Sequence, residues 1–160
     1  MATITKLGIP DPSNQLGASP YGNLTAFRYV LKTVASGAVE GGDSTAAVAS
    51  GDTVKLGLLP AGFRLIDSEI VVKTGLTATI TAKVGFAYAD GVDSTAVPQD
   101  DDYFGAGITV ATAGRYRNAT SNPSVTLPKE AWLTLTTAVA ANAKASELEI
   151  IVFAINEGVA

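Results

Sequence analysis

Apolar and polar residues alternate along much of the chain, and this period of two predicts short β-strands. Residues 25–33 place Phe27, Tyr29 and Leu31 on one face, and residues 54–58 alternate in the same way. Residues 79–88 show the clearest case, with apolar side chains at every second position from Ile80 to Tyr88. A Gly-, Ala- and Ser-rich loop is expected over residues 36–51.

A tight turn is expected at residues 59–62. Pro60 suits the second position of a type I turn and Gly62 the fourth. The next run, residues 63–73, sets Ile66, Ser68, Ile70 and Val72 on one face. We therefore expect residues 54–73 to form a β-hairpin.

The middle of the chain is more polar. Residues 89–107 are expected to form a Gly- and Asp-rich connection that contains Asp100, Asp101 and Asp102. Short strands are predicted at residues 108–111 and 124–127. A longer strand at 131–137 directs Leu133 and Leu135 inward, and it directs Trp132, Thr134 and Thr136 outward.

The last predicted strand, residues 147–155, begins as an alternation and then becomes apolar on both faces. Ile151 and Phe153 are the apolar residues on its second face. A strand of this kind is either central in a sheet or covered by another chain. Ile151 and Phe153 are therefore candidate interface residues.

Residues 1–23 have a different character, because glycine and proline recur every few positions. A helix or a long strand cannot run through such a segment. We expect an N-terminal arm over residues 1–23, either a frayed tail or a segment that becomes ordered on a neighbouring subunit. Pro10, Pro12 and Tyr21 are candidate contact residues of this arm.

These elements predict an all-β fold, a jelly-roll-like β-sandwich of about eight antiparallel strands at residues 24–160, preceded by the extended arm. A chain of 160 residues is long enough for one domain with its own core.

Composition narrows the function. The chain has no cysteine and no histidine, which removes the thiol nucleophile, the usual general base and the usual transition-metal ligands. Eleven basic and fifteen acidic residues give a net charge of −4, which argues against a nucleic-acid partner. No apolar run approaches a membrane span, and no signal peptide is recognisable, so synthesis in a cytoplasm is expected.

Candidate chemistry is sparse. Asp100, Asp101 and Asp102 could offer oxygen ligands to a hard cation such as Ca²⁺, but the glycine and distal glutamate of a calcium loop are missing, so a solvated turn is the preferred interpretation. Trp132 suits either a sugar-stacking platform or a subunit contact, and we favour contact or cover. Charged residues make up only 16% of the chain, a value that suits a surface hidden by partners and equally an Ala- and Thr-rich β protein. We expect neither enzymatic activity nor a cofactor.

The order of these segments resembles small virion proteins of tailed bacteriophages. The likeness begins with residues 54–72, where Leu59-Pro60-Ala61-Gly62 separates an apolar strand from a second strand that ends in Ile and Val. It continues through the Val-Gly strand at 83–88, the acidic loop that leads into 102–104, the Thr-Ala-Gly turn at 112–114, and the strands at 124–137 and 147–155.

The family that the chain resembles is that of head decoration or cement proteins, typically jelly-roll or related β-sandwiches. The resemblance implies a virion protein on the capsid exterior whose partner is the major capsid protein, and a homo-oligomer, dimer or trimer, that clamps capsid subunits. Two alternatives stay open: another virion part, such as a head-fibre base, minor coat or tail protein, and a carbohydrate-binding or adhesive module.

Overall fold

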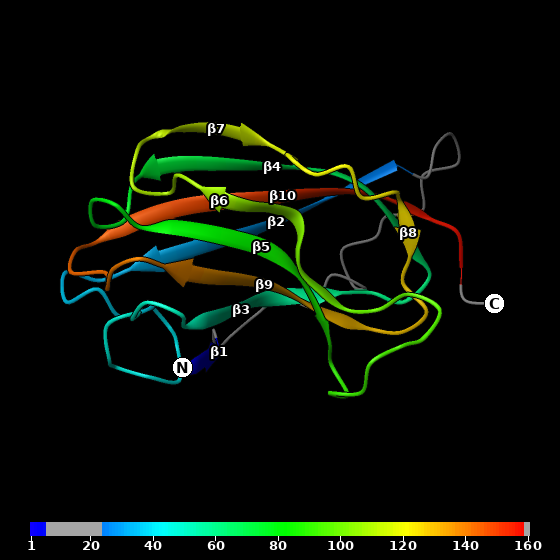
Figure 1. The fold of residues 1–160 in the computed structure, drawn as a ribbon, viewed down its shortest axis with the longest axis horizontal. Helices are drawn as coiled ribbons and strands as arrows, with labels where there is room; N and C mark the ends of the chain where they lie inside the picture. Colours follow the sequence, from blue (N-terminus) through cyan, green and yellow to red (C-terminus); the bar gives the residue numbers. More distant parts are fainter. Residues whose placement is uncertain (6–23, 159–160) are drawn as a thin grey trace.

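The computed structural model describes residues 1–5 and 24–158 and shows an all-β fold with no helix among these residues (Figure 1). Its strands are β1 (Thr3–Thr5), β2 (Leu24–Thr33), β3 (Thr53–Leu59), β4 (Phe63–Thr74), β5 (Thr81–Tyr88), β6 (Asp100–Ile108), β7 (Gly114–Arg117), β8 (Val125–Thr126), β9 (Ala131–Ala138) and β10 (Ser146–Asn156). No helix that could cross a membrane occurs in the described part of the chain.

The strands form two sheets. The first has the order β1-β3-β9-β5-β6, and the second has the order β2-β10-β4-β7 with β8 also paired to β4. The β1–β3 pair is parallel. The other ladders between named strands are antiparallel, as predicted. An all-β fold of two layered sheets is thus confirmed, while the jelly-roll-like connectivity stays a prediction.

The predicted hairpin at residues 54–73 is wrong. β3 pairs with β1 and β9 in one sheet, whereas β4 pairs with β10, β7 and β8 in the other, so the turn at 60–62 is a corner that carries the chain between layers. Gly62 has φ of 78°, which favours glycine. Its N–H donates to the carbonyl of Leu127 at 2.8 Å, so the corner is anchored to a distant segment.

A β-bulge corrects the expected face of β4. Phe153 of β10 lies opposite Asp67, but the next residue, Ala154, lies opposite Leu65. Ile66 is the extra residue of β4 at this point. A bulge shifts the alternation by one position, so Leu65 faces the core and Ile66 is exposed, while Ser68, Ile70 and Val72 are buried as expected.

The region from residue 89 to 117 also differs from prediction. Asp100–Ile108 forms β6 rather than part of a loop, and the short strand expected at 108–111 is absent. The arginine-bearing strand β7 was not predicted. β6 pairs with β5 across two register shifts, and such irregular pairing hides a strand from any alternation pattern.

The first residues of the expected arm belong to the sheet. Thr3–Thr5 pairs with Thr53–Lys55, and Ile4 is buried in the core. The domain therefore includes residues that the sequence pattern assigned to the arm. Pro10, Pro12 and Tyr21 lie in residues 6–23, outside the described residues.

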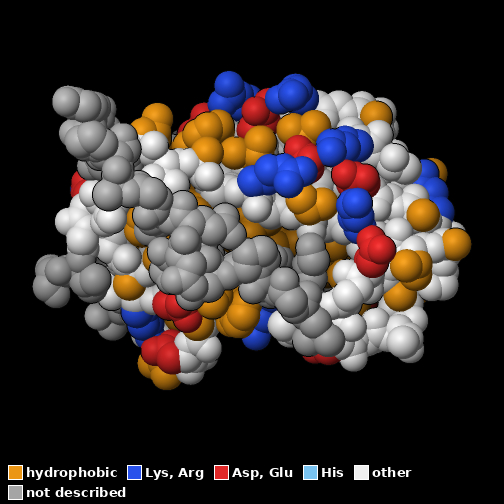
Figure 2. All heavy atoms as spheres, turned by 180° about the vertical axis from the view of Figure 1, so that it is seen from behind, with side chains coloured by type: hydrophobic (Ala, Val, Ile, Leu, Met, Phe, Trp, Pro, Cys, Tyr) orange, Lys and Arg blue, Asp and Glu red, His pale blue; other side chains and the backbone are white. Residues whose placement is uncertain are grey.

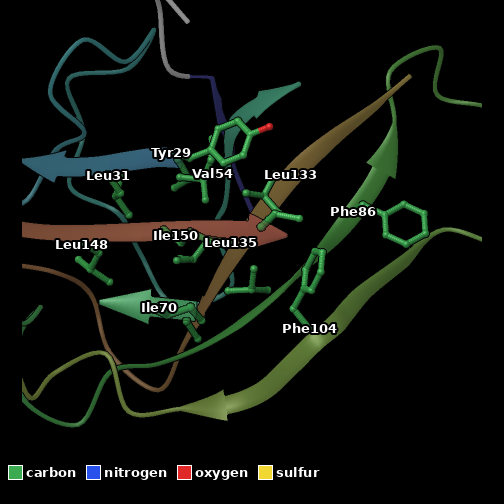
Figure 3. Packing of buried hydrophobic residues seen from close by; sticks show 14 of the residues in the cluster. Tyr29, Leu31, Val54, Ile70, Phe86, Phe104, Leu133, Leu135, Leu148 and Ile150 are labelled. Atoms are coloured by element: carbon green, nitrogen blue, oxygen red, sulfur yellow. The ribbon is translucent and has the colours of Figure 1, made fainter. Parts of the chain in front are cut away.

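One hydrophobic core fills the space between the sheets (Figure 3). The second sheet contributes Leu31 and Ile150, and the first contributes Val54 and Leu135. Near one end, Phe104 packs edge-on against Tyr103, with ring centroids 4.9 Å apart. β10 is the central strand between β2 and β4, which is one of the two arrangements that its long apolar run predicted.

Candidate interaction surface

The outer face of the second sheet carries the two interface candidates on β10. Leu148, Ile150 and Val152 point into the core and are fully buried, whereas Ile151 and Phe153 lie on the opposite face and are half-buried. An apolar stripe thus follows the outer side of the central strand.

Ion pairs surround this stripe. Glu149 pairs with Arg28 of β2 and with Lys73 of β4, whose Nζ lies 2.6 Å from its Oε1. Glu147 lies 3.1 Å from the Nζ of Lys73 and 3.8 Å from that of Lys32. The partners come from neighbouring strands, so the network follows directly from the order β2-β10-β4.

The edge strand β7 extends the network. Arg115 lies 2.7 Å from Glu69, and Arg117 lies 3.1 Å from Asp67. No strand was predicted from the sequence here. The alternation of Arg115, Tyr116 and Arg117 is the signal that would have indicated it. Figure 2 shows this face of the molecule, where basic and acidic side chains adjoin and hydrophobic side chains gather beside them.

The charges of this face nearly balance. Among the described residues, its ion pairs involve six basic residues (Arg28, Lys32, Arg64, Lys73, Arg115, Arg117) and five acidic ones (Asp67, Glu69, Glu147, Glu149, Glu157). The whole chain has eleven and fifteen. The acidic excess of the chain therefore lies elsewhere.

Glu149 pairs with basic residues on both neighbouring strands of this face. Hydrogen bonds from Arg28 and Lys73 lower the pKa of its carboxyl from 4.5 to about 2. A carboxyl group whose pKa is lower in the folded state than in the unfolded state stabilises the fold at pH values above its unfolded-state pKa. This stabilisation is lost as the pH falls toward the folded-state pKa. Glu149→Gln is therefore expected to reduce the loss of stability between pH 4.5 and 2, measured by urea unfolding at a series of pH values.

The matched control for this prediction is Glu40→Gln, which removes a carboxylate from an exposed loop position. It should retain the parent slope of stability against pH. If Glu149→Gln retained that slope as well, the ion pairs of Glu149 would have no influence on acid unfolding.

The acidic cluster Asp100–Asp102 begins β6, so the predicted turn is wrong, although Asp101 and Asp102 are exposed to solvent as expected. Three carboxylate oxygens lie within 4.8 Å of one another. Asp101 pairs with Lys83 and Asp100 accepts a hydrogen bond from Asn122 at 3.2 Å, so protein donors already contact two of the carboxylates. A hydrogen bond with Asp100 and burial raise the pKa of Asp102.

Trp132 lies on the outer face of the first sheet, between Leu58 and Ala87 on the adjacent strands. Its ring is half-buried, and the Nζ of Lys55 lies 5.3 Å from the ring centroid. Thr134, two residues on, is only 3% exposed, although the pattern placed it on a solvated face. The indole is thus partly covered by its own chain rather than standing as an open platform.

Two adjoining clefts share Ala96 and Val97 in their walls. Their carboxylates are Asp100 and Glu157. The first bonds to Asn122, and the second accepts from Arg64 at 2.6 Å and from Thr126 at 2.6 Å. Both acids are engaged in structural bonds, so neither cleft presents a pair of free acid and base groups.

Comparison with known proteins gives structural neighbours only. No protein-family model and no curated protein matches the chain. A chain from the capsid of Ralstonia phage GP4 superposes with a TM-score of 0.66 at 20% identity, over 99% of this chain and 100% of that one. A chain from the capsid asymmetric unit of cyanophage Pam1 superposes with a TM-score of 0.59 at 16% identity, over 93% and 98%. This chain therefore has a fold that is found in chains of bacteriophage capsids.

Proposed function

We propose that this chain is a virion structural protein without enzymatic activity. More specifically, we propose a capsid decoration or cement protein that binds the exterior of a phage head as a dimer or trimer and stabilises contacts between major capsid subunits. The observation that carries the proposal is the likeness to the two phage capsid chains. It spans nearly all of both partners in each comparison, so those chains are of about the same size as this one.

The architecture suits such a role. A cement protein needs a rigid body with large contact surfaces and no reactive group. Here two sheets share one core, and the long strand β10 is paired along both edges. Binding through several copies adds avidity, because each bound oligomer contacts several lattice subunits at once.

We propose the outer face of the second sheet as the surface that contacts the major capsid protein, with Ile151 and Phe153 at its centre. Its charged groups already pair with one another. Burying a pair that is already formed avoids leaving a charge without a partner, which is the larger penalty. The acidic excess of the chain would then remain on surfaces directed away from the lattice.

The test is a binding experiment with heads of the encoding phage that lack this protein. Purified protein should co-sediment with these heads and raise the temperature at which they release DNA. Ile151→Lys should weaken binding about tenfold or more, because it places a charge in the apolar stripe. Thr81→Lys, on the outer face of β5 in the first sheet, is the matched control and should bind like the parent.

Circular dichroism of both variants confirms that each is folded before binding is compared. A parent protein that fails to co-sediment would contradict the decoration role. Equal binding by Ile151→Lys and the parent would contradict the proposed face while leaving the role intact. A reconstruction of the particle with density for this chain in the tail would favour the alternative virion component.

A further inference from the structure

The short strand β1 is held by a well-defined site on the rest of the domain. Ile4 is 1% exposed and belongs to the hydrophobic core, although only three residues form the strand. Its register on β3 is fixed, with Thr3 opposite Thr53 and Thr5 opposite Lys55. One apolar side chain between two threonines thus anchors the strand.

Two carboxylates clamp the backbone on either side of Ile4. The N–H of Ala2 donates to Oδ1 of Asp52 at 2.7 Å, and the N–H of Thr5 donates to Oδ1 of Asp43 at 2.9 Å. In return, the N–H of Thr53 donates to the carbonyl of Ala2 and the N–H of Asp43 to the carbonyl of Thr5. Asp52 is only 5% exposed, so its charge is directed at this backbone and at the N–H of Ala49.

The connection from β1 to β2 is longer than the path requires. Residues 6–23 join Thr5 to Leu24, and 18 residues reach about 60 Å when extended. Thr5 lies opposite Lys55, from which β3 continues for four residues, or about 13 Å. Leu24 lies near the far end of β3, because its partner Ile155 pairs with Arg64 at the start of β4. The two layers are about 10 Å apart.

We propose that the β3 edge, with Asp43, Asp52 and the space for Ile4, is an acceptor site for β1 of a second copy of this chain. The contacts of an exchanged β1 are the same as those of its own β1, so exchange sacrifices no contact of the strand. The slack in the connection lets the strand reach beyond its own domain, and each copy carries one donor strand and one acceptor edge. Exchange therefore closes into a symmetric dimer or ring with every site filled.

The site sets a simple sequence requirement on the strand that it accepts. An exposed edge accepts many strands through backbone hydrogen bonds alone. Here the clamp excludes proline two residues before a buried apolar side chain and immediately after it, and that side chain lies in the core opposite Val54. The sequence Ala2-Thr3-Ile4-Thr5 meets this requirement.

Cysteine cross-linking tests the proposal in purified protein, because the chain has no cysteine of its own. Thr3 and Thr53 are direct partners on adjacent strands, which lie about 4.8 Å apart, within the range of a disulfide. Thr3→Cys and Thr53→Cys are prepared as separate variants, unfolded, mixed, refolded and oxidised. A disulfide-linked dimer containing one copy of each variant is expected, in at least about tenfold excess over the control mixture. The control pairs Thr3→Cys with Thr126→Cys on the remote strand β8.

The doubly substituted chain gives the opposing outcome. If it closes an internal disulfide as a monomer while the mixture of single variants gives only the control level of dimer, β1 remains on its own domain and the proposal is overturned. Sedimentation equilibrium provides a second measurement that does not depend on disulfide geometry. The parent and Ile4→Val should share one oligomeric mass, and Ile4→Asp should fall to the monomer mass; equal masses for the parent and Ile4→Asp would overturn the proposal. Heads are absent from both experiments, so their failure is separate from failure of capsid binding.

Discussion

Ile150→Ala is expected to lower the free energy of unfolding by about 4 kcal/mol, whereas Ile151→Ala should lower it by about 1 kcal/mol. Ile150 is fully buried on the central strand, with Tyr29 opposite it on one side and Ile70 on the other. Figure 3 shows its side chain among core residues of both sheets. Truncation removes buried apolar contacts and leaves a cavity that close-packed neighbours fill only in part.

The two substitutions delete the same atoms from adjacent residues of one strand. Their difference therefore reports the face on which each side chain lies, since the backbone propensity changes equally. Urea unfolding followed by circular dichroism measures both values. Equal losses of stability would contradict the register of β10, because a shift by one residue exchanges the two faces.

Strands that alternate without interruption were predictable from sequence. The alternations at residues 25–33 and 79–88 correspond to β2 and β5, whose inward residues are buried. In such strands the local sequence pattern is enough to predict the strand and its buried face, because one face meets the core and the other does not. The limit appears at β10, where the pattern left a central strand and a covered strand as equal options. Its pairing with β2 and β4, both distant in sequence, shows that it is central in its sheet; cover of its outer face by another chain is the proposal made above.

Strands formed by pairing rather than by pattern were missed. β6 contains three consecutive aspartates and two glycines, a composition that is poor in β-formers. It pairs with β5 because Gly85 leaves room for its backbone: a Cβ at Gly85 would lie 2.1 Å from the carbonyl oxygen of Asp100. Gly85 of β5 therefore allows β6 to pair with it. The sequence of either segment taken alone does not indicate this pairing.

The turn at residues 59–62 is present, but the hairpin predicted around it was wrong for a similar reason. Pro60 and Gly62 indicate a reversal of the chain, and the chain does reverse there, but a corner between two sheets and a hairpin within one sheet need the same residue types. The difference lies in which strands occupy the edges of β3 and β4, and those strands come from distant parts of the sequence.

The candidate surface was predictable only in its apolar part. Ile151 and Phe153 were identified from the doubly apolar run, and the structure places both on the outer face of β10. The ion pairs around them were not, because Arg28 and Glu149 are 121 residues apart. The acceptor edge for β1 was hidden in the same way, since Asp52 meets Ala2 only after β1 has paired with β3.

Asn142→Ala is expected to lower the free energy of unfolding by about 3 kcal/mol, although Asn142 lies in a turn. The residue is 1% exposed, and its side chain joins the end of β2 to the β4–β5 and β9–β10 connections. Its Nδ2 donates to Oγ1 of Thr33 at 3.0 Å and to the carbonyl of Lys144 at 2.8 Å, and its Oδ1 accepts from the N–H of Thr77 at 3.0 Å. Alanine removes all of these bonds and takes away the acceptor of the Thr77 N–H, while Thr33 Oγ1 and the carbonyl of Lys144 keep their bond to each other at 2.9 Å. The loss combines several buried hydrogen bonds with one backbone donor that must find a new partner.

Asn118→Ala is the matched control for this prediction. Its Oδ1 also accepts from a backbone N–H, that of Thr120 at 3.1 Å, but this bond is local and water can replace it at a partly exposed site, so a loss of about 1 kcal/mol is expected. Hydrogen exchange should distinguish the variants further. Loss of Asn142 should release the amides of Thr77 and Ala143, which its turn holds, before those of β10. Equal stability of the two variants would show that the loops at this end are held by the sheets alone, because the buried amide would then contribute no more than a surface one.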